Sequence, residues 1–205
     1  MKQKHHYEFY PDFLYSEEAD YLYKRLNEEI PWTQVRYFKP ERGYVVTPRE
    51  TWCAGIHNRL DLKNFYLEHN EIPKWLIPLK ELVEEHSKQK FNFLLFSKYR
   101  DENDSISYHS DNENFLGKSP TIASITTGQQ RPFLLKHKIT KAVETFNLSH
   151  GSLFIMKDNC QEDYFHSVPK QKQSLNQKIS ITFRNGINEK ASQNYYYYNT
   201  SQNSF

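Results

Sequence analysis

Two stretches in the first half of the chain carry apolar residues three or four positions apart, which is the spacing of one face of a helix. In the first stretch these positions are Ala19, Leu22, Leu26 and Ile30, and in the second they are Trp75, Leu76, Leu79, Leu82 and Val83. Ser16 precedes the first stretch as a candidate N-cap, and the second stretch begins near Pro73. The pattern therefore predicts two helices.

From residue 91 onward the apolar residues fall in short runs that are rich in β-branched and aromatic side chains. Polar, turn-forming residues separate six such runs: FNFLLFSKYR, TIASITT, RPFLLKH, AVETFNL, GSLFIM and KISITFR. Runs of this length and spacing are typical of a β-sandwich or barrel. We therefore expect an α+β fold in which two helices support an antiparallel β-core.

Length and composition favour one domain. A chain of 205 residues can bury one substantial core, and no linker rich in Pro, Gly or Ser divides it. We expect a single domain over 1–187 and a flexible tail over 188–205, where Tyr, Asn, Gln and Ser replace aliphatic residues. Stacking of the tail on bases is an alternative to a tail of no specific function. A net charge of +2 does not by itself indicate a nucleic-acid partner, so any basic surface must be local.

The cysteines and the N-terminal residues indicate a reducing, intracellular environment. Cys53 and Cys160 form neither a CxxC pair nor a disulfide framework. The N-terminal stretch has no apolar segment of the kind found in signal peptides, and no run approaches membrane-spanning length. We expect a cytoplasmic or nuclear protein that does not bind membranes.

The stretch SYHSDNE, residues 107–113, places His109 and Asp111 two positions apart. If this segment is extended, both side chains point to the same side of the strand and can bind one ion. Two histidines and one carboxylate are the protein ligands of nonheme Fe(II) oxygenases, in which the other coordination positions stay open. The pair alone is a weak signal, because the number of His-x-Asp pairs expected by chance in a chain of this composition is about one third.

The surrounding sequence supports this pair and supplies a third ligand. His166 follows the apolar run GSLFIM and precedes a turn at Pro169, so a second strand can bring it to the same ion. A rival pair, His69 and Glu71, lies in a polar stretch that runs into a predicted helix, with no β-runs around it. We therefore prefer His109, Asp111 and His166 as the metal site.

The last β-run, KISITFR, separates polar from apolar side chains by strict alternation. One face carries Lys178, Ser180, Thr182 and Arg184, and the other carries Ile179, Ile181 and Phe183. On a strand that faces solvent this pattern is ordinary. If the polar face points into a barrel, its cations need an anionic partner, because an unpaired buried charge is too costly. A dicarboxylate cosubstrate would provide that partner.

With these features the chain resembles the AlkB family of Fe(II)- and 2-oxoglutarate-dependent dioxygenases, which remove alkyl groups from nucleic-acid bases. Four blocks carry the resemblance in the family's order: NFLLFSKYRDENDSISYHSDNE, SPTIASITTGQQRPFLLKHK, HGSLFIMKDNCQEDYFHSVPK and KISITFR. The resemblance implies a double-stranded β-helix, or jelly roll, over roughly 91–187, with N-terminal helices supporting it. It also implies a nucleotide lid over roughly 35–70.

The resemblance assigns roles to residues of the predicted pocket. It implies His109, Asp111 and His166 as iron ligands, which would also make them the catalytic residues. It implies contacts to 2-oxoglutarate from Tyr99, Lys178, Ser180, Arg184 and Ser97. Two departures stand out, because the family usually has Asn in place of Ser97 and Arg-x-Asn in place of Lys178-Ile179-Ser180. Lysine keeps the positive charge but loses the bidentate fork of arginine, so we expect a retained but altered pocket.

Substrate contacts are implied less specifically. Glu113 matches an acidic position that meets the damaged base, and Arg49 matches an arginine of the lid. Trp52, Phe65 and Tyr66 lie in the lid segment, where each is either a base-stacking or a core aromatic residue. Further candidates for phosphate contacts, or simply a solvated basic surface, are Lys136, His137, Lys138, Lys170 and Lys172. Tyr37 and Phe38 are candidates for an apolar finger that opens duplexes.

The implied activity is oxidative demethylation of bases such as 1-methyladenine or 3-methylcytosine in DNA or RNA, with Fe(II), 2-oxoglutarate and O2. The partner would be alkylated DNA or RNA, in DNA repair or RNA demethylation, and we expect a monomer. One alternative is a 2-oxoglutarate oxygenase that acts on a protein or a small molecule. Another is a noncatalytic nucleic-acid-binding relative, against which the intact set of three candidate ligands argues.

Overall fold

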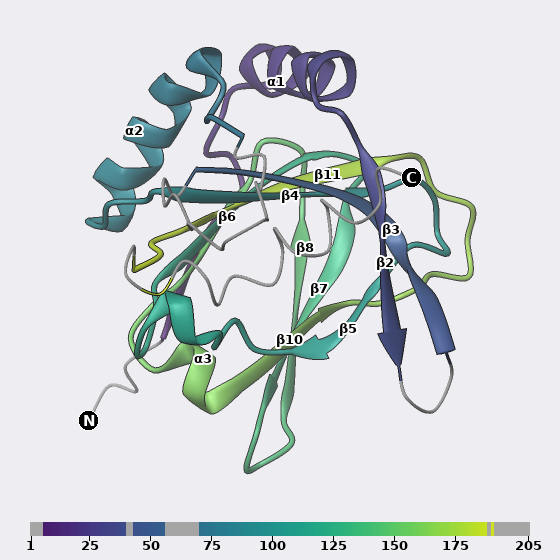
Figure 1. Ribbon diagram of the computed structural model, residues 1–205, viewed down its shortest axis with the longest axis vertical. Coiled ribbons are helices and arrows are strands. Elements are labelled where there is room, and N and C mark those ends of the chain that lie inside the picture. Colours follow the sequence, from purple (N-terminus) through teal and green to yellow (C-terminus); the bar gives the residue numbers. More distant parts are fainter. Residues whose placement is uncertain (1–5, 40–42, 56–69, 188–189, 191–205) are drawn as a thin grey trace, which may run out of the picture.

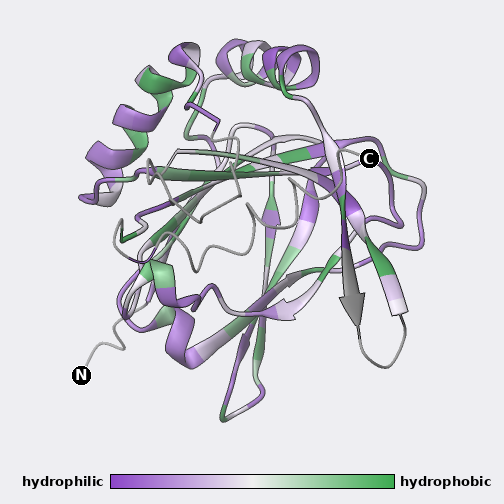
Figure 2. Ribbon diagram, viewed as in Figure 1, coloured by the Kyte–Doolittle hydropathy of each residue, from purple (hydrophilic) through white to green (hydrophobic). Residues whose placement is uncertain are grey.

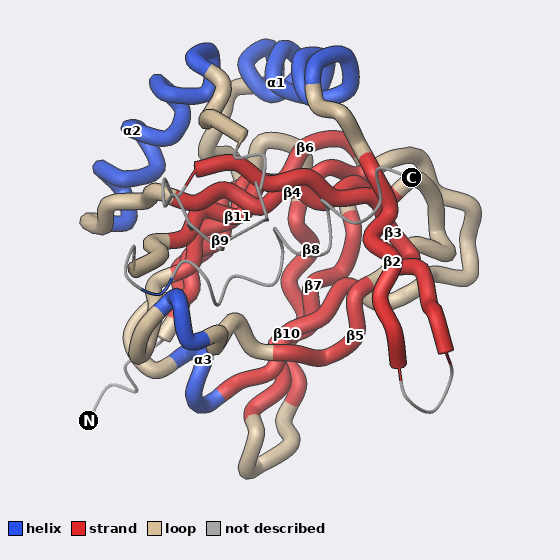
Figure 3. Tube along the Cα trace, in the orientation of Figure 1, coloured by secondary structure: helices blue, strands red, loops and turns tan. Residues whose placement is uncertain are grey.

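The computed structural model describes residues 6–39, 43–55, 70–187 and 190. Their strands form two antiparallel sheets, which the tube in Figure 3 shows in red around a common interior. In the large sheet the order is β1 (Tyr7–Tyr10), β9 (Leu153–Met156), β6 (Ile122–Gly128), β11 (Lys178–Arg184), β4 (Phe93–Tyr99), β3 (Gly43–Gly55) and β2 (Thr33–Lys39). In the small sheet it is β5 (Ile106–His109), β10 (Tyr164–Val168), β7 (Arg131–His137) and β8 (Val143–Leu148).

Helices cover the side of the large sheet that faces away from the small one (Figure 1). They are α1 (Ser16–Glu29) and α2 (Ile77–Ser87), with the 3-10 turn η1 (Lys74–Leu76) leading into α2. Two shorter elements, η2 (Asn114–Leu116) and α3 (Cys160–Asp163), lie between strands. No helix in the described ranges is long and apolar enough to cross a membrane.

Both predicted helices are present, with a small correction at the first. Tyr15 rather than Ser16 is the N-cap of α1, and its backbone N–H donates to the Glu18 carboxylate at 3.0 Å. The apolar face of α1 is buried as the spacing predicts, with Ala19 and Leu26 fully enclosed.

Two apolar cores lie on the two sides of the large sheet. One lies between the helices and the sheet and contains Leu26, Leu76 and Phe183. The other lies between the two sheets and contains Phe93 and Phe154. A strand covered on both sides needs a continuous apolar run, and Figure 2 shows β4 as mostly hydrophobic.

The alternation predicted for KISITFR is confirmed, and its polar face points inward. Ile179, Ile181 and Phe183 belong to the core under the helices. Lys178, Ser180, Thr182 and Arg184 line a pocket between the sheets. Of the two interpretations of this face, the solvent-facing one is therefore wrong, and the interior of the molecule holds buried cations.

All six predicted β-runs form strands, as β4, β6, β7, β8, β9 and β11. Of the strands in the described ranges, β1, β2 and β3 were not predicted, while β5 and β10 were expected only as the strands that carry His109 and His166. The long β3 extends the large sheet by pairing with β4, from Glu50 opposite Lys98 to Gly55 opposite Phe93. Most of the expected tail, and positions 40–42 and 56–69 of the expected lid, fall outside the described residues.

Candidate metal centre

Two strands of the small sheet bring the candidate histidines together. His109 is the last residue of β5, and His166 lies in the middle of β10. They are direct cross-strand partners, so both rings project from the same face of the sheet. Their ring centroids are 4.2 Å apart. The cross-strand register therefore creates a pair of imidazoles from residues 57 positions apart in the sequence.

Asp111 reaches the histidines from just beyond the end of β5. The expectation that the extended segment continues to Asp111 is wrong by two residues, because the strand ends at His109. Two contacts orient the aspartate instead. Its backbone N–H donates to Gln161 Oε1 at 2.9 Å, and Arg184 Nη2 donates to its Oδ2 at 2.8 Å. The remaining oxygen, Oδ1, is directed toward the two imidazoles.

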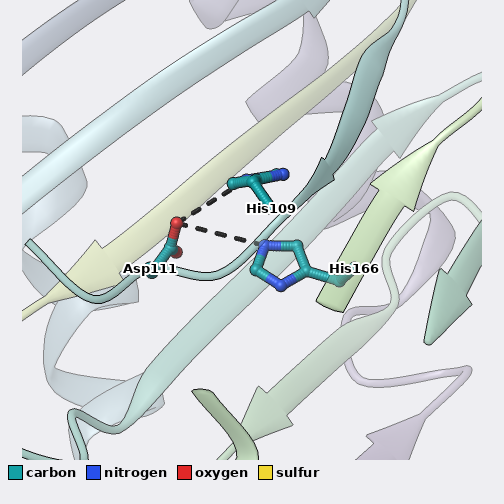
Figure 4. Close-up of side chains that lie close together, drawn as sticks. All are labelled: His109, Asp111 and His166. Carbon is teal, nitrogen blue, oxygen red and sulfur yellow. Dashed lines mark ion pairs between the residues drawn. The ribbon is translucent and has the colours of Figure 1, made fainter. Parts of the chain in front are cut away.

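The three side chains converge on one point, as Figure 4 shows. Asp111 Oδ1 lies 3.6 Å from His109 Nε2 and 4.0 Å from His166 Nε2. That oxygen is buried and accepts no hydrogen bond from any residue in the described part of the chain. A buried carboxylate oxygen without a donor, facing two imidazole nitrogens, fits a divalent cation with one oxygen and two nitrogen ligands.

Local electrostatics keep the potential ligands in the forms that bind metals. Burial by itself would raise the pKa of Asp111, but Arg184 and the two histidines together hold it well below its usual range. Burial, together with the neighbouring His109, lowers the pKa of His166 to about 3. At neutral pH the aspartate is therefore ionised and His166 is neutral, which leaves a carboxylate and a nitrogen lone pair available.

Lys178 is a second buried charge in the same pocket. Its side chain is only 1% exposed, and its Nζ atom donates to Thr126 Oγ1 at 3.0 Å and to Ser180 Oγ. No ion pair among the described residues includes Lys178. Burial, with a contribution from Arg131, lowers the pKa of Lys178 to about 7. Because burial disfavours the charged ammonium form, an anion that enters the pocket would stabilise that form.

The register of β11 places the other cosubstrate candidates beside Lys178. Tyr99 on β4 is opposite Lys178, and Ser97 is opposite Ser180. The Lys178 Nζ atom lies 5.7 Å from the centroid of the Tyr99 ring. The two positions where the chain has Ser instead of the family's usual Asn are thus direct neighbours across two strands. All five residues expected to contact 2-oxoglutarate line the pocket.

Three residues that the sequence analysis did not single out contribute to this site. They are Gln161, which holds the Asp111 backbone, Thr126, which accepts from Lys178, and Arg131. Arg131 is fully buried and donates to the carbonyls of Asp101, Asp104 and Pro169. No local signal distinguishes them, because an arginine after a turn or a glutamine in a polar stretch is normally on the surface.

The candidate substrate contacts are spread over several environments. Arg49 lines the pocket. Trp52 lies on the opposite face of β3, where its ring packs 5.1 Å from that of Phe96 under the helices, so its position supports the core alternative. Glu113 is the N-cap of η2. Phe65 and Tyr66 lie outside the described residues.

The five basic candidates are not among the residues that line the pocket. Lys170 and Lys172 are exposed, while Lys136, His137 and Lys138 are half-buried at the end of β7 and in the turn that follows it. Tyr37 and Phe38 belong to β2. In the rival metal pair, His69 lies outside the described residues.

Comparison with known proteins identifies sequence relatives over most of the chain. A family model described as the 2OG-Fe(II) oxygenase superfamily matches residues 6–184. Alpha-ketoglutarate-dependent dioxygenase alkB homolog 3 of Rattus norvegicus is 34% identical over 187 residues, which cover 85% of this chain and 62% of the relative. DNA oxidative demethylase ALKBH2 of Mus musculus is 33% identical over 184 residues, which cover 82% of this chain and 74% of the relative. The chain therefore spans about three fifths of the first relative and about three quarters of the second.

A solved structure confirms the fold. The structure titled "The structure of OsALKBH1" superposes with a TM-score of 0.65 at 13% sequence identity, covering 90% of this chain and all of the other. At this identity the match concerns the fold alone. It supports the expected jelly roll of two facing sheets, with His109 and His166 on the small sheet and β11, which carries Lys178 and Arg184, in the large one.

Proposed function

The chain belongs to the AlkB family of the 2OG-Fe(II) oxygenase superfamily, and from this we propose that it oxidatively demethylates N-alkylated bases in DNA or RNA. One observation carries the proposal. A single pocket holds a buried His-Asp-His cluster and, on the facing strand, a buried lysine that has no carboxylate partner in the described part of the chain. The two subsites match a divalent metal and a dicarboxylate.

His109, Asp111 and His166 would hold Fe(II). The cross-strand register fixes the two imidazoles, and Gln161 and Arg184 fix the carboxylate. Because Arg184 donates to Oδ2, Asp111 is oriented to offer Oδ1 to the metal. Ligands that are held before the metal arrives lose little freedom on binding, which favours affinity.

Lys178 would bind the carboxylate of 2-oxoglutarate that is farther from the metal. An ammonium group with two hydroxyl neighbours, Thr126 and Ser180, can share its remaining donor with that carboxylate. Tyr99 provides a further hydrogen-bonding group, and Arg131 provides further positive potential. The Arg131 guanidinium lies 5.5 Å from the centroid of the Tyr99 ring. Charge pairing in a buried pocket is strong because water does not compete for the donors.

The chemistry itself belongs to the bound group: Fe(II), 2-oxoglutarate and O2 together oxidise the N-alkyl carbon, and the alkyl group then leaves as an aldehyde. The chain contributes positioning and exclusion of water. Apolar side chains of both sheets line the pocket around the polar residues, among them Leu95, Phe133 and Val168. A dry lining protects the reactive site from side reactions.

The nucleic-acid substrate is supported by the relatives and by two polar residues. Arg49 lines the pocket and offers a cation for a phosphate. Glu113 lies two residues after Asp111, and a carboxylate there complements the positive charge of 1-methyladenine or 3-methylcytosine. The relatives named above are a dioxygenase of the alkB type and a DNA oxidative demethylase.

The test measures demethylation and succinate formation on oligonucleotides that carry 1-methyladenine or 3-methylcytosine. DNA and RNA, each single- and double-stranded, are compared in the presence of Fe(II), 2-oxoglutarate and ascorbate. Asp111→Ala and His109→Ala should abolish repair, while Asp12→Ala, which changes an exposed carboxylate, should not. Circular dichroism establishes that each variant is folded.

Each result decides between the functions considered. Repair that is lost in both site variants supports the proposal and ranks the substrates. Succinate that forms without repair shows an oxygenase of another substrate, such as a protein or a small molecule. If the folded protein binds metal but forms neither product, the demethylase proposal is wrong for these substrates, and a nucleic-acid-binding role becomes the better explanation.

A further inference from the structure

We propose that the outer face of the small sheet is a second contact surface for single-stranded nucleic acid, in which Tyr108 and Phe165 stack with bases and Lys136 and Lys138 meet phosphates. The inference extends the proposed function, because it assumes a nucleic-acid substrate. We call these four residues the aromatic-lysine surface.

Strand geometry places the two aromatic rings on the face opposite the metal site. Tyr108 precedes His109 on β5, and Phe165 precedes His166 on β10. Successive side chains of a strand point to opposite faces, so the histidines point into the pocket and the aromatic residues point outward. Tyr108 is 41% exposed and Phe165 is 36% exposed, which is unusual for side chains of this size.

Each ring has a lysine above it. Phe165 is the cross-strand partner of Lys136 on β7, so their side chains share the outer face. The Lys136 Nζ atom lies 5.3 Å from the centroid of the Tyr108 ring, and the Lys138 Nζ atom lies 4.8 Å from that of Phe165. The surface is thus built from two cation-π pairs on neighbouring strands.

The charge of this surface selects its partner. The strands β5, β7 and β10 contain no Asp or Glu, and neither lysine forms an ion pair within the ranges that the structure describes. Lys138 Nζ donates to the carbonyl of Gln161 at 2.8 Å, which leaves its charge without a carboxylate partner in the described ranges. Flat rings between such cations complement a chain of bases joined by phosphates. A second copy of this protein would bring the same positive charges opposite one another, which disfavours a symmetric dimer through this face.

The surface is also continuous with the pocket entrance. Figure 1 shows β5 beside β10, and β5 is the edge strand of the small sheet. The His109 side chain is 29% exposed on one face of this strand, and Tyr108 lies on the other face. When the damaged base of a single strand enters the pocket, the neighbouring bases therefore need to cross only the edge of β5 to reach Tyr108.

The experiment separates binding from catalysis. Fluorescence anisotropy measures the affinity of the metal-free protein for a labelled dodecathymidylate. A double variant, Tyr108→Ala with Phe165→Ala, should bind about tenfold or more weakly, because stacking on aromatic side chains contributes this much per base. Lys136→Ala should weaken binding and reduce its salt dependence. The matched control is Tyr15→Ala, which removes an 80% exposed ring next to α1 and should leave affinity within about twofold.

A second readout tests the geometry. A methylated trinucleotide is too short to occupy both sites, so the native protein and the double variant should demethylate it equally well. A methylated dodecamer should be a better substrate than the trinucleotide for the native protein but not for the double variant. Unchanged dodecamer binding in the folded double variant overturns the inference. So does a size-exclusion profile that shifts from dimer to monomer, because the surface would then serve self-association. If the native protein demethylates neither substrate but the double variant still loses binding, the aromatic-lysine surface is supported and only the proposed function is refuted.

Discussion

Lys178 carries a charge that its surroundings do not neutralise. Burial lowers its pKa to about 7 when the pocket is empty. Below this pH the ammonium group is already present and can pair with a carboxylate directly. Above it, the neutral amine must first take up a proton, so the Kd for 2-oxoglutarate should rise by up to about tenfold per pH unit. The affinity should therefore be highest at neutral or mildly acidic pH and should fall toward alkaline pH.

Isothermal titration calorimetry with Mn(II) in place of Fe(II) measures this dependence. Proton uptake should appear as a binding enthalpy that changes with the ionisation enthalpy of the buffer. Lys178→Arg is the matched variant, because arginine stays charged over the whole range and should give a flat profile from about pH 7 to about pH 9. An equally steep profile in this variant would assign the titration to another group.

Gln161 is a positioning residue whose removal should loosen the metal site without changing a ligand. Its Oε1 atom accepts from the Asp111 backbone at 2.9 Å, and its Nε2 atom contacts Met156 Sδ at 3.3 Å. Outer contacts of this kind alter metal affinity by about 10-fold to 100-fold. Gln161→Ala should therefore weaken Co(II) binding by about this factor, as followed by absorption spectroscopy.

The control for this prediction is Gln130→Ala, which changes an exposed glutamine in the turn before β7. It should leave Co(II) affinity unchanged. If Gln161→Ala binds Co(II) as tightly as the native protein while keeping its fold, the Asp111 carboxylate is positioned by Arg184 alone.

At the level of elements, the sequence was informative where one face of an element is apolar. The helical spacing found α1 and α2, and the alternation in 178–184 correctly separated the core face of β11 from its pocket face. The strands β2 and β3 were missed because their pattern is mixed. β3 contains Pro48 and alternates between exposed and half-buried residues over its first half. Such a strand forms because of its partners in the sheet.

The same limit applies to the candidate site. The spacing of His109 and Asp111 and the position of His166 between an apolar run and a turn were sufficient to propose the metal ligands. The contacts that orient them were not predictable, because Gln161 and Arg184 meet Asp111 across 50 and 73 positions of the sequence. Arg184 reaches Asp111 through the register of β11, and Gln161 reaches it from α3, which precedes β10.

The end of β3 illustrates how an element can depend on one glycine. Gly55 has a φ of +92°, and a Cβ atom there would lie 2.0 Å from the carbonyl oxygen of Asn92. Gly55→Ala should therefore destabilise the fold by about 2 kcal/mol or more, which corresponds to a decrease of about 5 °C or more in Tm. Differential scanning calorimetry measures both.

Gly43 provides the matched control at the other end of the same strand. Its φ is +70°, but a Cβ atom there would have no neighbour within 4 Å among the residues that the structure describes. Gly43→Ala should cost only the backbone strain of about 1 kcal/mol. Equal losses in the two variants would show that the contact with Asn92 relaxes and that backbone conformation is the whole effect.

For the whole molecule, the metal site is also a connection between the two sheets. His109 and His166 belong to the small sheet, while Arg184, which binds Asp111, belongs to the large one. A ligand that binds only the folded protein stabilises it by mass action, by about 2.7 kcal/mol at a concentration 100 times its Kd. For a chain of this size, saturating Mn(II) should therefore raise Tm by about 5 to 10 °C.

Thermal unfolding with and without Mn(II) measures this coupling. His109→Ala should lose most of the shift, because one of three ligands is gone, whereas His86→Ala, which changes an exposed histidine on α2, should keep it. Since β5, β10 and β11 come from both sheets, the shift should appear in a single transition that moves as a whole. A shift confined to one of two separate transitions would mean that the sheets unfold independently and that the site stabilises only the small one.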